Sequence, residues 1–97
     1  QKPIKPIGII KIDQGASDAI LRRGASVLLV GITEIQGEFS TNQPIKIVNQ
    51  EGKEVARGLC SFGSEKIREL QKIRLNSEKS PIIIHRDVLV LTSNLFN

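Results

Sequence analysis

Short apolar segments rich in isoleucine and valine recur along the chain, and glycine, proline or polar turns separate them. β-Branched side chains suit the half-buried surface of a sheet, so this pattern favours strands over long helices. Two stretches with helical spacing interrupt the strands. The sequence therefore predicts a mainly β fold with short helices (α+β), in the order β-α-β-β-β-α-β, with strands at residues 7–12, 26–39, 44–48, 54–62 and 82–91.

The first predicted helix has a signal at each end. Asp13 can cap a helix over Ala16–Arg23, and Gly24 can end it in the left-handed conformation. For the second helix, Ser64 is the expected N-cap, and the apolar face fades near Ile73. Both helices are too short to be stable without packing against the strands.

The strands differ in expected burial. Val27–Val30 is an uninterrupted apolar run, which predicts a strand covered on both faces. Residues 26–39 are either one long strand or two joined strands, with bends or bulges expected at Gly31 and Gly37. The turn Asn49–Gly52 joins two strands into a hairpin. Residues 82–91 are expected to form one closing strand, in which His85–Asp87 is a polar break.

The chain has 97 residues, enough for one domain, and its net charge is +4. No apolar run is long enough to cross a bilayer, and the N-terminus lacks the apolar segment of a signal peptide. Cys60 is the single cysteine and is expected to be a buried, inert thiol without a disulfide. We expect a cytoplasmic location without membrane contact, with residues 1–6 as a proline-stiffened linker and residues 7–97 as the domain.

The positive charge is uneven: residues 1–23 and 57–97 each carry a net +3, whereas residues 24–56 carry −2. Two arginines at a helix end beside a glycine turn could contact a phosphate backbone. The alternative is that they only stabilise the helix C-terminus, where cations are favourable. With few aromatic rings available for stacking bases, any RNA contact should read backbone and shape. The predicted RNA or partner contacts are Arg22, Arg23, Gly24, Ala25, Ser26, Arg57 and Arg86.

Three other candidate sites, a kinase catalytic loop, a P-loop and a metal site, lack the further residues that each would need. His85-Arg86-Asp87 matches the start of a protein-kinase catalytic loop, but position 92 is Thr where that motif needs Asn, and no glycine-rich ATP loop is present. No glycine run is followed by lysine as a P-loop requires. A lone histidine without clustered ligands does not make a metal site, so His85 is expected to be a hydrogen-bonded structural residue. The sequence therefore predicts no catalytic, cofactor or metal-binding residue in this chain.

Several segments together resemble a PUA domain, in the version found at the C-terminus of the glutamate 5-kinase family. The segments that carry the resemblance are residues 8–16, Arg23–Ile32, Ile35–Phe39, Val55–Leu59 with Phe62 and Ser64–Glu65, and Ile84–Asp87 with Leu89–Leu91. The resemblance implies a mixed-sheet pseudo-barrel. The chain departs from the family pattern at two places. Asn42-Gln43-Pro44 stands where family members tend to carry Gly-Asp, and the segment Lys72–Pro81 is shorter than in the family, so a partner contact that relatives make through that segment is not expected here.

The resemblance also implies a parent enzyme that phosphorylates L-glutamate with ATP and magnesium to begin proline biosynthesis, as a homo-oligomer. The leading hypothesis is a non-catalytic domain joined to that kinase domain, supporting assembly or regulation, including the response to proline. The second hypothesis is an RNA-binding PUA module that recognises structured RNA. A structural domain without a ligand is the third.

Overall fold

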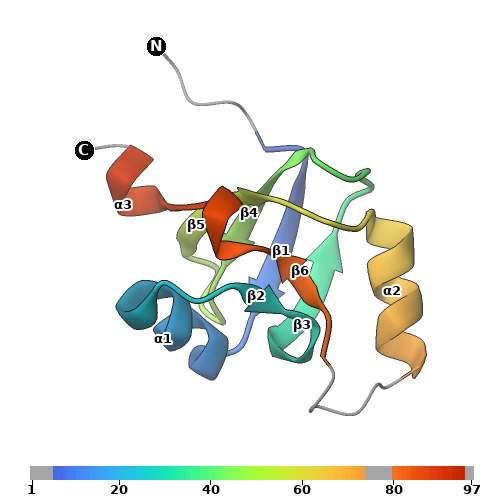
Figure 1. The fold of residues 1–97 in the computed structure, drawn as a ribbon, viewed down its shortest axis with the longest axis horizontal. Helices are drawn as coiled ribbons and strands as arrows, with labels where there is room; N and C mark the ends of the chain where they lie inside the picture. Colours follow the sequence, from blue (N-terminus) through green and yellow to red (C-terminus); the bar gives the residue numbers. More distant parts are fainter. Residues whose placement is uncertain (1–5, 74–79, 96–97) are drawn as a thin grey trace.

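Two sheets and three α-helices make up the fold in the computed structural model, which describes residues 6–73 and 80–95 (Figure 1). The larger sheet has the order β3-β1-β4-β5-β7, and the smaller pairs β2 with β6. The pair β1–β4 is parallel and the other pairs are antiparallel, so the larger sheet is mixed. The strands are β1 Gly8–Ile12, β2 Val27–Leu28, β3 Ile32–Gln36, β4 Pro44–Val48, β5 Glu54–Leu59, β6 Ile82–Ile84 and β7 Leu89–Leu91.

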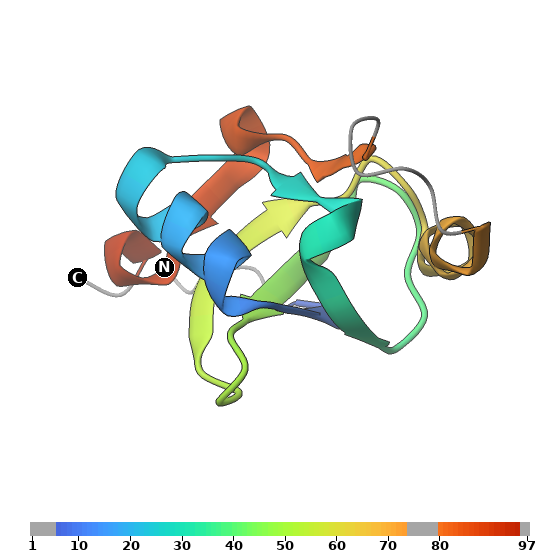
Figure 2. The ribbon, with the colours of Figure 1, turned by 90° about the horizontal axis from the view of Figure 1, so that it is seen from below.

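The helices lie at the edges of this β core. They are α1 Gln14–Arg23, α2 Ser64–Ile73 and α3 Thr92–Leu95. Figures 1 and 2 place α1 and α2 at opposite ends of the molecule. The interior is dominated by isoleucine. In β1 and β4 the inward side chains alternate along the strand, whereas β6 buries two consecutive residues and α2 contributes one. The fully buried isoleucines include Ile10, Ile12, Ile45, Ile47, Ile67, Ile83 and Ile84.

Helix α1 confirms the predicted end signals, although it begins at Gln14. The Asp13 carboxylate accepts a hydrogen bond from the backbone N–H of Ala16 at 2.8 Å. Gly24 has a φ of 61°, and its N–H donates to the carbonyl of Ile20. Both caps satisfy backbone groups that the helix itself leaves unpaired.

Residues 26–39 contain two strands and not one long strand, which is the second of the two predicted alternatives, and the bend expected at Gly31 is confirmed. After β2, residues Leu29–Gly31 form a 3₁₀ turn, and β3 then joins the other sheet. Gly31 lets this turn pack closely against α1, because a Cβ at that position would lie only 2.7 Å from the Cβ of Ala16. Leu28 and Val30 are exposed, so the expectation of a strand covered on both faces was wrong.

The predicted closing strand over residues 82–91 is also divided. β6 pairs with β2, whereas β7 pairs with β5, and the 3₁₀ turn Arg86–Val88 carries the chain between the sheets. His85–Asp87 is therefore an exposed turn and not a polar break within a buried strand. The helix α3 that follows was not predicted.

Ser64 does not act as the predicted N-cap, since α2 begins at Ser64 itself. Its buried hydroxyl accepts a hydrogen bond from the backbone N–H of Phe39 at 3.0 Å and lies 3.1 Å from Oε1 of Glu38, to which it can donate. This side chain therefore ties the segment after β3 to α2. The predicted apolar face is confirmed, because Ile67 is buried and Leu70 packs against the core.

The hairpin of β4 and β5 is confirmed, although β5 ends at Leu59 and not at Phe62. A turn precedes β4, where Asn42 has a φ of 62° and the Gln43 side chain accepts from the N–H of Ser40. The predicted linker lies outside the described residues except for Pro6. Residues 74–79 of the shortened segment also lie outside them.

Candidate functional site

The arginines predicted to contact RNA lie at the C-terminal end of α1. Arg22 and Arg23 are exposed, and their charges suit the carbonyl end of the helix. Gly24 is exposed, and no heavy atom of the described residues beyond its chain neighbours lies within 4 Å of where its Cβ would stand. The turn thus presents two guanidinium groups beside backbone that a ligand can approach closely.

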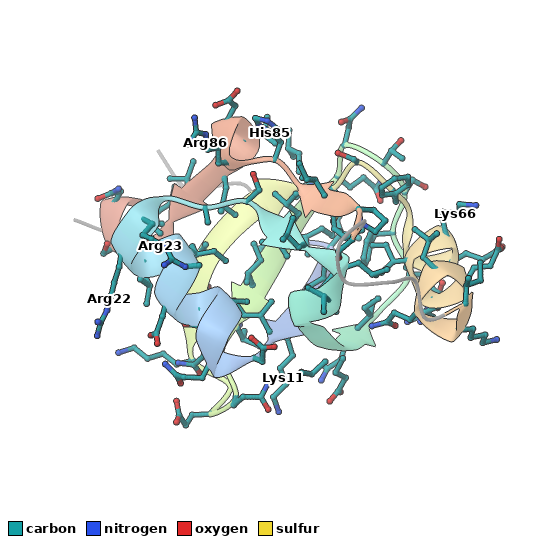
Figure 3. The ribbon with its side chains drawn as sticks, turned by 60° about the horizontal axis from the view of Figure 1, so that its bottom comes forward. Lys11, Arg22, Arg23, Lys66, His85 and Arg86 are labelled. Atoms are coloured by element: carbon teal, nitrogen blue, oxygen red, sulfur yellow. The ribbon has the colours of Figure 1, made fainter. Side chains whose placement is uncertain are left out.

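A hydrogen bond joins this turn to a segment sixty residues away in sequence. The Ser26 hydroxyl accepts from the backbone N–H of Arg86 at 2.8 Å. Figure 3 shows Arg22 and Arg23 on α1, and His85 and Arg86 on the 3₁₀ turn beyond them. The structure therefore places the backbone of Arg86 next to the Arg22–Ser26 turn, whereas Figure 3 shows the side chains of Arg86 and Arg22 pointing away from each other.

His85 is a hydrogen-bonded structural residue, as predicted, and it caps the turn that carries Arg86. Its Nδ1 accepts a hydrogen bond from the backbone N–H of Asp87 at 3.1 Å and lies 3.4 Å from the Asp87 carboxylate.

Arg57 has a different setting from the other predicted contacts. It lies on β5, and its guanidinium is 2.8 Å from the Glu54 carboxylate, with 18% of the side chain exposed. Burial alone would raise the pKa of the Glu54 carboxyl, but hydrogen bonds from Arg57 and Thr92 hold that pKa below its usual range. The charge of Arg57 is therefore balanced within the fold.

Cys60 is fully buried, as predicted, and desolvation raises the pKa of its thiol to about 12. At neutral pH such a thiol is protonated and a poor nucleophile. Within residues 6–73 and 80–95, no three His, Cys, Asp or Glu side chains lie close enough together to hold a metal ion. In the same residues, no helix is long and apolar enough to span a bilayer.

Among known families, the PUA domain family matches residues 8–79 of this chain. The chain belongs to the PUA domain family. This PUA domain is 50% identical over 88 residues to the glutamate 5-kinase of Prochlorococcus marinus strain MIT 9313, and 52% identical over 90 residues to that of strain NATL2A. The matches cover 91% and 93% of the chain but only 24% and 25% of those relatives, so the chain spans about a quarter of their length.

Solved structures support the fold. A PUA domain from Aeropyrum pernix K1 superposes with a TM-score of 0.71 over 82% of this chain and 41% of that one, at 20% identity. A chain of an archaeal box H/ACA sRNP complex superposes with a TM-score of 0.68 over 88% of this chain and 24% of that one, at 18% identity. A chain of an H/ACA RNP bound to a substrate RNA superposes with a TM-score of 0.63 over 94% of this chain and 26% of that one, at 13% identity. The predicted PUA-like mixed sheet is thus confirmed.

Proposed function

We propose that this PUA domain is the non-catalytic C-terminal domain of a glutamate 5-kinase, which phosphorylates L-glutamate with ATP in the first step of proline biosynthesis. The observation that carries the proposal is about 50% identity, over about nine-tenths of the chain, to two enzymes of that name. Because the chain matches about a quarter of their length, the remaining polypeptide has room for a separate kinase domain.

In this proposal the kinase domain and the PUA domain have separate roles. The kinase domain of the same polypeptide binds ATP, magnesium and glutamate, and the PUA domain supports assembly of a homo-oligomer or regulation, including the response to proline. The parent enzyme works in the cytoplasm. The buried, protonated Cys60 and the capping role of His85 fit a domain whose polar groups serve its own fold.

The test deletes the segment corresponding to residues 7–97 from the full-length polypeptide. We expect the oligomeric mass, measured by light scattering, or the inhibition curve for proline to change. A matched control carries Gly15→Ala, an exposed helix substitution that leaves the fold and the Arg22–Ser26 turn intact. If mass and proline response are both unchanged by the deletion, the proposed role is contradicted.

A second candidate function is binding of structured RNA. The observation that favours it is the pair of exposed arginines, Arg22 and Arg23, at the end of α1, beside the segment of Arg86 that hydrogen-bonds to Ser26. Cations in this arrangement can neutralise phosphates and release counterions. Two of the structural neighbours are chains of H/ACA ribonucleoproteins, one of them bound to a substrate RNA.

The RNA candidate is tested by measuring the affinity for a structured RNA across a salt series. Arg22→Ala/Arg23→Ala should weaken binding and reduce the slope of log K against log salt by about one unit for each phosphate that is no longer neutralised. Lys66→Ala/Lys72→Ala on α2 removes the same charge elsewhere and is the matched control. Equally weakened binding in both double variants would reduce the effect to net charge and contradict a defined site.

A further inference from the structure

An apolar groove lies where β5, β7 and α3 meet. It is a hollow of about 310 Å³. Its wall includes Val88 and Val90, which are 40% and 44% exposed although both are aliphatic. The complete lining is Pro44, Arg57, Gly58, Leu59, Val88, Val90 and Leu95. Exposed aliphatic side chains gathered in one hollow are typical of an interaction surface.

The electrostatics of the groove favour a protein partner over a nucleic acid. Among the described residues that line it, Arg57 is the one with a charge, and the Glu54 carboxylate at 2.8 Å balances that charge. Thr92 at the start of α3 donates to the same carboxylate, which also ties α3 to β5. A neutral apolar surface does not attract phosphates. The exposed Arg22, Arg23 and Arg86 are not among the residues that line the groove, although Arg86 is on the same 3₁₀ turn as Val88.

The path of the chain shows what could reach the groove. The backbone N–H of Ile7 donates to the carbonyl of Pro44 at 2.8 Å, and Pro44 lines the groove. A second hollow formed by Pro6–Ile9, Lys46 and Arg57 shares Arg57 with it. The start of β1 is therefore at the rim of the groove, and Figure 1 shows it and α3 in the same half of the view.

We propose that this groove is the docking surface for the kinase domain of the same polypeptide. The inference rests on the proposed function, because the occupant is the part of a glutamate 5-kinase that precedes this domain. The relatives are about four times as long as the chain, and Pro6, the first described residue, lines the hollow that shares Arg57 with the groove. Covering Leu59, Val88 and Val90 removes their apolar surface from water, and tethering supplies a high effective concentration.

The test uses cysteine labelling at two positions of equal exposure. Val90→Cys lies in the groove, whereas Ile82→Cys lies on the β2–β6 sheet, and the native side chains are 44% and 43% exposed. Val88→Cys is a second groove variant in case one substitution disturbs the fold. Cys60 is fully buried and does not compete for the reagent. Labelling rates are compared, by peptide mass spectrometry, between the 97-residue chain and the full-length polypeptide.

We expect Val90→Cys to be labelled at least about tenfold more slowly in the full-length polypeptide, which corresponds to a contact worth about 1.4 kcal/mol. Ile82→Cys should be labelled at the same rate in both. Equal rates for Val90→Cys in the two proteins would overturn the inference. Slowing in the 97-residue chain alone as its concentration rises would assign the groove to a second copy and also overturn it.

The glutamate-dependent formation of ADP by the full-length polypeptide is measured in parallel. Its absence would refute the proposed function, whereas the labelling ratio reports on the groove whether or not the polypeptide phosphorylates glutamate. The two failures can therefore be told apart.

Discussion

Gly58 controls how closely the turn that carries Arg86 approaches β5, and Gly58→Ala should destabilise the domain. A Cβ at this position would lie 2.6 Å from Cγ2 of Ile84 and 2.9 Å from the carbonyl oxygen of Val88. Ile84 is fully buried and the second contact is backbone, so neither can move aside easily. Overpacking of this kind costs about 1–3 kcal/mol. Alanine also restricts the unfolded chain, which offsets about 0.5 kcal/mol. We expect a net destabilisation of about 2 kcal/mol.

Urea unfolding followed by circular dichroism measures this destabilisation. The midpoint should fall with an unchanged m value, and the melting temperature should drop by about 8–16 °C for a domain of this size. Gly15→Ala is the matched control, because its nearest heavy atom is Oδ1 of Asp13 at an ordinary 3.6 Å. In a helix this change stabilises by about 0.5–1 kcal/mol. If Gly58→Ala is as stable as the parent chain, the reasoning from close approach is refuted.

Three further predictions concern single side chains. Asp13→Ala should lower the free energy of unfolding by about 1 kcal/mol, since it removes the N-cap of α1, whereas Asp13→Asn should retain most of the stability that the cap provides. Equal destabilisation by the two substitutions, measured by urea unfolding, would contradict the role of Asp13 as a cap. Ser26→Ala should speed hydrogen exchange at the Arg86 amide, measured by NMR, because that amide is left without its acceptor; unchanged exchange would argue against the bond. The pKa of Glu54 is lower in the folded state than its ordinary value of 4.5, so its stabilisation is present above that pH and disappears as the pH falls below it. Glu54→Gln should therefore reduce the acid dependence of stability, and an unaltered pH profile would contradict this.

The features that the sequence predicts well are encoded by neighbouring residues. Asp13 and Gly24 define the ends of α1 through contacts within four or five positions of the chain. The hairpin of β4 and β5 depends on the turn at Asn49–Gly52, where the Asn49 carboxamide accepts from the N–H groups of Glu51 and Lys53. Local signals of this kind can be read without knowing the partners of each segment.

The features that the sequence does not predict depend on distant partners. Residues 82–91 form two strands because one part pairs with β2 and the other with β5, a choice that no local pattern contains. Ser64 has the residue type of an N-cap, but its hydroxyl hydrogen-bonds to the backbone N–H of Phe39 and to the carboxylate of Glu38, about 25 positions away. Tertiary contacts here override local preference.

The candidate site shows the same division. Arg22–Ser26 was found from a helix end followed by glycine, and the exposure of its two arginines agrees with that interpretation. That the backbone of Arg86 lies beside it depends on a hydrogen bond across sixty residues. Arg57 looked equally available in the sequence, yet Glu54, three residues earlier, pairs with it.

The central claim is that this PUA domain belongs to a glutamate 5-kinase without taking part in its chemistry. The most direct measurement is the initial rate of glutamate-dependent ADP formation by the full-length polypeptide and by the same polypeptide without residues 7–97. The account predicts activity in the full-length protein and measurable phosphoryl transfer in the folded, truncated one. Complete absence of activity in a truncated protein whose circular dichroism and melting curve show it to be folded would contradict the claim.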